Sequence, residues 1–237
     1  MSDFFYDLGS QVYQNFIEAD RWRRYLDGLG ISFTVTIGAL ALGIVLGVLV
    51  AIVRSSYEQK QTKKSGWLKF VNAICKIYIT VIRGTPMMVQ LLIMNFVIFQ
   101  SSRNLVGIAI LALGINSGAY VSEIIRSGIM SIDRGQMEAG RSLGLTYGVV
   151  MQNVIIPQAV KNILPALGNE MITLFKDSSL VTVIGLADLT KVAIQIQAKT
   201  YQAFMPFIGI ACIYLIVVMI LTKLLDALER RLRRSER

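Results

Sequence analysis

Three stretches without any Asp, Glu, Lys or Arg limit what this chain can fold into. They cover residues 28–53, 104–122 and 200–222 of the 237-residue chain. A helix needs about 20 apolar residues to cross the hydrocarbon core of a bilayer, so each stretch predicts a transmembrane helix. Only 16% of the residues are charged, against about a quarter in soluble domains. We therefore expect an integral membrane protein of the all-α class.

Two further spans are weaker in the sequence. One covers about 84–102, extended backwards through 70–82, and Pro86 predicts a kink in it. The other covers about 154–177. It is interrupted by Pro157, Pro165, Glu170 and Lys176. Together with the three charge-free stretches, these spans predict five transmembrane helices.

The distribution of Lys and Arg selects an orientation for these five spans. With the N-terminus outside, the inner segments carry 15 Lys and Arg residues and the outer segments carry 6. Cytoplasmic loops carry the excess of cations in membrane proteins, so the sequence predicts an N-out, C-in chain. We expect an extracytoplasmic segment over 1–30, a transmembrane domain over 31–227 and a basic cytoplasmic tail over 228–237.

Small residues recur in two spans at helical spacing. On a helix, small residues at every fourth position form a shallow groove that lets another backbone approach closely. Such a groove serves helix packing within one subunit or an interface between subunits, and the pattern leaves both open. The residues are Ala39, Gly43, Gly47 and Ala51 in the first span, and Gly114 and Gly118 in the span over 104–122.

The composition and motifs argue against several kinds of functional site. The chain has no His, and Cys75 and Cys212 lie in apolar runs without CxxC spacing, so we expect two buried, reduced thiols and no metal site. No GxxxxGK[ST] motif is present either. If the chain moves a solute uphill, the energy must come from a partner or from an ion gradient. A membrane enzyme would need a metal or a nucleophile–base pair, which the sequence does not offer.

The long loop over 131–165 contains a helix signature. Asp133 followed by Gln136 predicts a helix N-cap with its capping partner, and Gly144 predicts a left-handed residue after a short helix that ends at Leu143. A second short helix is expected before Pro157. Such a compact knob fits a partner's groove, or it only covers the end of the helix bundle. Glu138 and Arg141 would share one face of the first helix, and Ala139 and Leu143 another.

The run over 142–160 is also free of charged residues, but it carries polar residues and glycines. We interpret its first half as cytoplasmic and its second half as the beginning of the span over 154–177.

This loop resembles the EAA loop of ABC-importer permeases. The matching segments are "EAGRSLG" over 138–144 and "VIIPQA" over 154–159, in which Glu138, Ala139, Gly144 and Pro157 fit the pattern and Gly140 departs from the usual Ala. The segments over 81–92, 117–144 and 164–189 are similar to the polar amino acid subfamily of these permeases. The resemblance covers about 40–190.

The resemblance implies a type I ABC importer permease that carries a polar amino acid across a bacterial cytoplasmic (inner) membrane. It implies a second permease subunit, two cytoplasmic ATPases that bind ATP and Mg²⁺, and an extracytoplasmic amino-acid-binding protein; this chain would bind no cofactor itself. The alternative is a self-sufficient secondary transporter or channel, although the chain lacks the inverted repeats usual in secondary transporters. The coupling loop would cover about 128–156, and its coupling residues would be Glu138, Ala139, Gly140, Arg141, Gly144 and Pro157.

Two charged residues lie near the inner end of the span over 104–122. Glu123 and Arg126 are three residues apart, close enough to pair on one face of a helix. We expect either a solvated ion pair or an inner gate lined by polar groups.

The segment "LFKDSSL" over 174–180 places a cation beside an anion in an apolar region. Charges that face lipid are costly, so these side chains should face the bundle interior or a watery cavity. A cation and an anion together suit the two charged ends of an amino acid. Alternatively, they anchor the helix at the membrane surface or pair to pin its end. The pathway residues predicted here are Glu170, Thr173, Lys176, Asp177 and Ser178.

Overall fold

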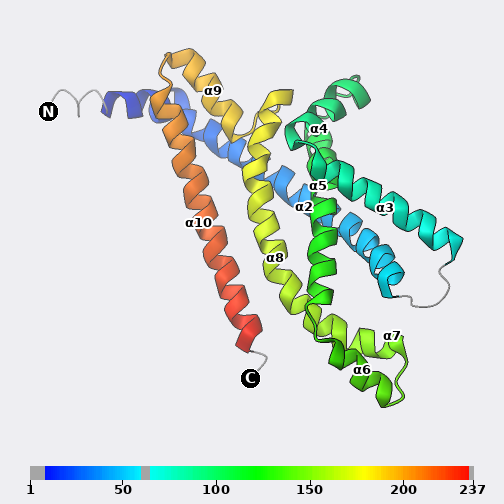
Figure 1. The fold of residues 1–237 in the computed structure, drawn as a ribbon. Helices are drawn as coiled ribbons and strands as arrows, with labels where there is room; N and C mark the ends of the chain where they lie inside the picture. Colours follow the sequence, from blue (N-terminus) through cyan, green and yellow to red (C-terminus); the bar gives the residue numbers. More distant parts are fainter. Residues whose placement is uncertain (1–8, 60–64, 235–237) are drawn as a thin grey trace.

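The computed structural model describes residues 9–59 and 65–234, and all regular structure in these two ranges is helical (Figure 1). In chain order, the elements are the π-helical turn η1 (Tyr13–Ile17), the 3-10 turn η2 (Glu18–Asp20), α2 (Arg21–Gln59), α3 (Gly66–Gly84), α4 (Met87–Ile93), the π-helical turn η3 (Met94–Ile98), α5 (Leu105–Met130), α6 (Arg134–Ser142), α7 (Tyr147–Val150), the π-helical turn η4 (Met151–Ile155), α8 (Ile156–Asp177), the 3-10 turn η5 (Ser178–Ile184), α9 (Leu189–Thr200) and α10 (Phe204–Arg234).

Three helical segments within the described residues are long and apolar enough to cross a membrane. They are Gly9–Glu58, which contains α2, Leu105–Met130 and Phe204–Leu232. Each contains most or all of one charge-free stretch of the sequence, which confirms the three strongest spans. Two pairs of bent helices pass the same test, so the number of crossings is up to five if each pair forms one span.

The span expected over 70–102 is a broken pair rather than one kinked helix. α3 and the segment Met87–Ile98 meet at an angle of 107°. Thr85 and Pro86 are extended, so the helix stops and begins again. The side chain of Gln90 donates to the carbonyl oxygens of Ile82 at 2.7 Å and Thr85 at 3.1 Å. These bonds satisfy backbone groups that a broken helix leaves without partners, and they stabilise the sharp corner.

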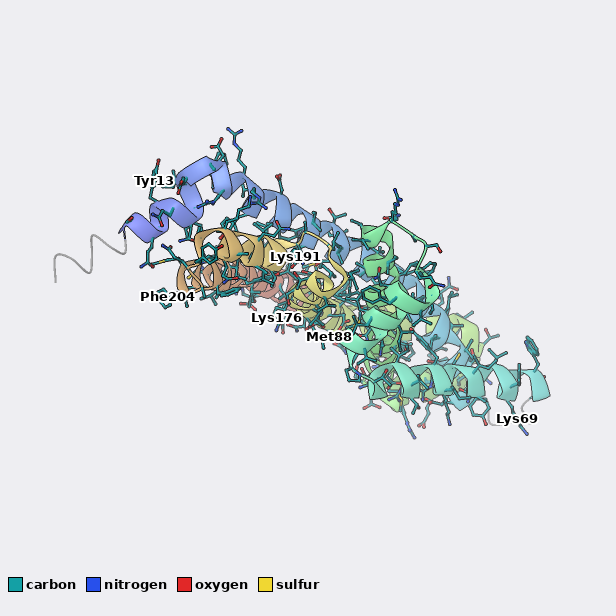
Figure 2. The ribbon with its side chains drawn as sticks, turned by 90° about the horizontal axis from the view of Figure 1, so that it is seen from above. Tyr13, Lys69, Met88, Lys176, Lys191 and Phe204 are labelled. Carbon is teal, nitrogen blue, oxygen red and sulfur yellow. The ribbon has the colours of Figure 1, made fainter. Side chains whose placement is uncertain are left out.

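The long helices lie side by side with the loops at their two ends. α8 packs against α5 on one side and α10 on the other, while α2 crosses them diagonally (Figure 1). α6 and α7 lie at one end of the bundle, and α9 lies at the other, next to the N-terminal helical turns. The C-terminal end of α10 points towards the end that carries α6 and α7. α3 projects to one side, with Lys69 near its far end (Figure 2).

The small residues of α2 and α5 bring these two helices together. A Cβ atom on Gly43 would lie 2.8 Å from Oγ of Ser117, and one on Gly114 would lie 2.7 Å from Leu42. Real Cβ atoms do not approach other atoms this closely, so larger residues would force the helices apart. The groove therefore packs helices within one subunit, as the first of the two interpretations predicted.

The two cysteines differ in burial. Cys75 is buried on α3, as expected, but Cys212 is exposed on α10. α10 is apolar on nearly every side, with large residues such as Leu215 and Ile216 exposed. Its sequence therefore does not distinguish a core face from a lipid face, and the expectation that Cys212 is buried was wrong.

Helical structure extends into both expected end segments. α2 begins at Arg21, inside the segment expected to lie outside the membrane over 1–30. At the other end, α10 continues to Arg234, so most of the basic tail over 228–237 is helical; residues 235–237 lie outside the described residues.

Candidate functional site

α6 and α7, with the turn between them, form the knob at one end of the bundle. The knob begins with the N-cap that the sequence predicted. Asp133 is the N-cap of α6, and its Oδ1 accepts a hydrogen bond from the backbone nitrogen of Gly135 at 2.6 Å. Gln136 contributes its backbone nitrogen, which donates to the carbonyl oxygen of Asp133 at 3.1 Å. The cap is therefore at the expected residue, and the donor to its side chain is Gly135.

The knob turns at Gly144, which has the left-handed conformation that the sequence predicted, with φ of +80°. The backbone nitrogen of Leu143 donates to Ala139, and that of Leu145 donates to Gly140 at 3.2 Å. These bonds close the last turn of α6. A Cβ atom on Gly144 would meet nothing within 4 Å. The position needs glycine for its backbone conformation and not for space.

Close packing explains why residue 140 is glycine, and the sequence alone did not reveal this. A Cβ atom there would lie 2.6 Å from Cγ2 of Val150, and both residues are buried. Alanine would therefore push α6 away from α7. The departure from the usual EAA pattern lets the two helices of this knob approach more closely.

The outer surface of the knob combines charged and apolar side chains. Glu138, Ala139 and Arg141 are exposed, and Leu143 is 81% exposed. Leu145, Tyr147 and Val149, between α6 and η4, are also exposed. Exposed large apolar side chains near charged ones are common at protein–protein contacts.

The second helix of the loop does not end before Pro157. α7 continues through η4 into α8, and Pro157 lies in the first turn of α8. Proline lacks the backbone N–H that an α-helix needs, and the π-helical turn directly before it shifts the hydrogen bonds by one residue. α7, η4 and α8 therefore form one uninterrupted helical segment, and α6 is joined to it by the turn at Gly144.

The predicted pair of Glu123 and Arg126 is part of a larger ionic network. Nε and Nη2 of Arg126 lie 3.0 and 2.8 Å from Oε2 of Glu123, and Nη1 of Arg54 lies 2.5 Å from its Oε1. Nη2 of Arg54 also lies 3.3 Å from Glu58. Arg54 therefore ties α2 to α5. Sequence reasoning missed it, although it is the first charged residue after the stretch over 28–53.

Glu170 joins α8 to α5 near the middle of both helices. It is half-buried, and its Oε1 accepts a hydrogen bond from Oγ of Ser117 at 2.7 Å. The nearest predicted neighbour, Thr173, is exposed and donates to the carbonyl oxygen of Asn169 in its own helix. Glu170 is therefore the predicted pathway residue that bridges two helices.

The end of α8 separates the other predicted pathway residues. Lys176 is exposed, and Asp177 is half-buried. Ser178 is fully buried and donates to the carbonyl oxygen of Phe175 at 2.7 Å. The chain changes from α-helix to 3-10 turn at Ser178, which turns this side chain inward. The structure therefore places Ser178 inside the bundle, away from the exposed side chains of Thr173 and Lys176.

Further polar groups lie along α5 and face α3 and α4. Nδ2 of Asn116 donates to Oε1 of Gln90 at 3.0 Å, and the guanidinium of Arg83 lies 5.0 Å from the ring centroid of Tyr120. Asn116, Tyr120 and Glu123 are four and three residues apart, so they share one face of α5. That spacing was visible in the sequence.

Comparisons with known proteins agree with this architecture. The family described as "Binding-protein-dependent transport system inner membrane component" matches residues 65–234. The chain is 41% identical to the arginine transport system permease protein ArtQ of Bacillus subtilis (strain 168), over 89% of this chain and 93% of ArtQ. It is 35% identical to the glutamine transport system permease protein GlnP of Escherichia coli (strain K12), over 88% and 92% of the two chains.

Solved structures share the fold. A crystal structure described as an amino acid ABC transporter with histidines has a TM-score of 0.80 and 44% identity, over 88% of this chain and 94% of that one. An inward-facing structure of the MetNI methionine ABC transporter has a TM-score of 0.75 at 19% identity, over 91% and 99%, which shows the fold alone. The chain belongs to the family of binding-protein-dependent transport system inner membrane components, and it is the permease component of an amino acid ABC importer.

Proposed function

We propose that this permease moves a polar amino acid, delivered by an extracytoplasmic binding protein, across a bacterial inner membrane as one of two paired permease subunits. Two partner ATPases, which bind ATP and Mg²⁺, drive the transport. The observation that carries the proposal is the exposed knob of α6 and α7, in which α7 continues through η4 into α8. The relatives named for arginine and glutamine transport favour a polar cargo.

The proposed orientation has five crossings, with the N-terminus outside and the C-terminus inside. α3 with α4, and α8 with α9, would each serve as one bent crossing. The excess of Lys and Arg in the inner segments supports this orientation. In this frame the knob is the cytoplasmic coupling element. Glu138, Ala139, Gly140, Arg141 and Gly144 would meet the ATPase, while Pro157 would shape the junction with α8.

A reconstituted complex tests the proposal directly. The chain should co-purify with a roughly stoichiometric ATPase and, in vesicles, should accumulate arginine or glutamine only when ATP and the binding protein are present. Comparing ATPase stimulation by different amino acids would identify the cargo. Uptake driven by an ion gradient in the absence of an ATPase would instead support a secondary transporter.

The network around Glu123 is proposed to hold the inner gate closed at rest. Arg54 and Arg126 both bond to this carboxylate, and both side chains are largely buried. Replacing Arg54 by Gln leaves Glu123 with fewer donors and removes the ion pair between α2 and α5. We expect the basal ATPase rate or the solute leak in vesicles to rise about fivefold, the effect of roughly 1 kcal/mol on a two-state equilibrium.

The matched control is Glu58→Gln, because Glu58 lies at the exposed edge of the same network. It should leave the resting state near that of the parent, since exposed ion pairs contribute little. Identical basal rates in the parent, Arg54→Gln and the double variant Glu123→Gln/Arg126→Gln would mean that the network is only a solvated ion cluster.

The two charges at the end of α8 are proposed to contact the charged ends of the cargo. Lys176→Met and Asp177→Asn should lower uptake or change amino acid preference without altering ATP binding by the partner. Lys199→Met is the matched control, because Lys199 is an exposed lysine in the last turn of α9. If both α8 variants assemble and transport every amino acid as the parent does, these charges are membrane anchors.

A further inference from the structure

One arginine at the corner between α3 and α4 lacks an acidic partner within the described residues. Arg83 lies in the last turn of α3 and is exposed, and no carboxylate in this part of the chain lies within ion-pair distance of it. Its guanidinium group lies 5.0 Å from the ring centroid of Tyr120, a contact between a cation and an aromatic face. The cation is therefore positioned, while its charge is left for another partner.

This arginine lies at the depth of the hydrocarbon core. α5 has 26 residues and is one of the long apolar helices, and Tyr120 lies about 4 Å along the helix axis from its midpoint. The core of a bilayer extends about 15 Å on either side of its midplane. A charge at such a depth is costly when it faces lipid, so Arg83 should face a watery space.

Tyr120 lies on the side of α5 that α2 does not cover. Gly118 packs against α2, because a Cβ atom there would lie 2.9 Å from Cβ of Leu46. Tyr120 follows Gly118 by two residues and so points about 200° away from it around the helix. Tyr120 is 37% exposed. The side of α5 on which Arg83 rests is thus open in the single permease chain.

Gln90 fixes the end of α3 against α5. Its amide nitrogen donates to the carbonyl oxygens of Ile82 and Thr85, and its Oε1 accepts a hydrogen bond from Asn116 of α5 at 3.0 Å. α3 ends beside α5 (Figure 1). Because Ile82 directly precedes Arg83, these bonds also place the guanidinium group before any ligand arrives. Such preorganisation lowers the cost of binding.

The carboxylate one turn further along α5 is already neutralised. Glu123 has both oxygen atoms bonded, Oε1 to Arg54 and Oε2 to Arg126. Three arginines thus lie around one acidic residue, and two of them occupy it. Arg83 is the one that remains available to an anion from outside the chain.

A carboxylate from α8 reaches the same region of α5. Glu170 accepts its hydrogen bond from Ser117, which is three residues before Tyr120. Residues three apart are neighbours on a helix, so a cation from α3 and an anion from α8 meet α5 on adjacent turns. Lys176 lies six residues beyond Glu170, about 9 Å along α8. It therefore acts at a different depth from Arg83.

We propose that Arg83 binds the carboxylate group of the amino acid during its passage and so selects cargo that carries this group. This inference rests on the proposed function. A guanidinium group offers two parallel N–H donors to a carboxylate, and the ring of Tyr120 holds the guanidinium group in place from one face. An amide of the same amino acid has no negative charge at this position, so it should bind less tightly.

Binding to the complete permease–ATPase complex in nanodiscs, with the binding protein left out, tests this role. Unlabelled arginine and argininamide are compared as competitors of radiolabelled arginine at about pH 6, where the α-amino group of both is protonated. The parent should bind arginine about tenfold or more tightly than the amide, the effect of one hydrogen bond to a charged group. Arg83→Gln should bind both about equally, with the affinity that the parent shows for the amide.

Matched variants separate this role from a general loss of charge or packing. Arg103→Gln removes an exposed arginine in the loop before α5 and should leave the preference for arginine over its amide unchanged. Tyr120→Phe keeps the aromatic face and should also preserve the preference. Tyr120→Leu removes the face that positions the guanidinium group and should reduce the preference several-fold. Arg83→Lys keeps a cation and should retain part of the preference.

An assembled Arg83→Gln complex that keeps the parent's preference would overturn the proposal. Equal weakening of arginine and argininamide would also overturn it, because Arg83 would then serve only to pack α3 on α5. If Arg83→Gln does not assemble, an unchanged preference in Tyr120→Leu counts against the role. A parent that accumulates no amino acid with ATP and the binding protein present contradicts the proposed function itself. Normal parent uptake without any preference for the carboxylate contradicts the role of Arg83 alone.

Discussion

Gly144→Val is expected to lower coupled uptake by about tenfold or more while the external protein still binds its amino acid. Gly144 holds φ at +80°, a conformation that costs about 1–2 kcal/mol for residues with a Cβ atom and more for a β-branched one. The turn between α6 and α7 would rearrange to relieve that strain. Because α7 is continuous with α8, the ATPase would then lose its rigid connection to the spanning helices. Uptake and ATP hydrolysis in reconstituted vesicles measure this loss.

Two further variants separate backbone strain from added bulk. Gly148→Val introduces the same side chain four residues later, also where a Cβ atom would meet nothing within 4 Å, but without a positive φ. Gly144→Asn keeps a side chain at the turn, and asparagine tolerates the left-handed region. Gly148→Val and Gly144→Asn should therefore retain much more uptake than Gly144→Val. Normal transport-coupled hydrolysis in Gly144→Val would show that the knob does not couple the ATPase to the spans.

The sequence predicted the parts of the fold that depend only on residues close together in the chain. The three charge-free stretches became α2, α5 and α10 because length and apolar content alone decide whether a helix can span hydrocarbon. The cap at Asp133 and the left-handed turn at Gly144 were also predictable, because each depends on a few neighbouring residues. The family followed from the order of several such motifs along the chain.

Features that depend on distant contacts were not predictable in the same way. The break at Pro86 is a corner because Gln90 satisfies the freed carbonyl groups, whereas proline alone indicates only a kink. Arg54 lies 69 residues from Glu123, and its role follows from the crossing of α2 and α5. Ser178 is buried at the point where the α-helix changes to a 3-10 turn, and local spacing does not predict that change.

In the candidate pathway too, local spacing was predictable from the sequence and contacts between helices were not. The spacing of charged residues identified Glu170 and the pair of Glu123 and Arg126. Spacing on one helix could not reveal that Ser117 of α5 is the hydrogen-bond partner of Glu170, or that Arg83 lies over the ring of Tyr120. These contacts join α5 to α8 and to α3, and they follow from helix packing.

The candidate pathway also leads to the second large effect, at Glu170. Its carboxylate is half-buried between α8 and α5 and accepts a hydrogen bond from Ser117. We propose that it meets the ammonium group of the amino acid. A hydrogen bond to a charged group contributes about 1.5–3 kcal/mol, so Glu170→Gln should raise the substrate concentration needed for half-maximal uptake roughly 10- to 100-fold. Transport assays in reconstituted vesicles would measure this shift.

The Gln variant separates this role from a structural one. Glutamine has nearly the same shape as glutamate and can still accept the hydrogen bond from Ser117, while it removes a charge that is costly within a membrane. The complex should therefore assemble at least as well as the parent. Ser117→Ala is the converse control, because it removes the hydroxyl group and leaves the carboxylate; its uptake should remain within a few-fold of the parent. If Glu170→Gln transports normally and Ser117→Ala assembles poorly, the contact serves only to hold α8 against α5.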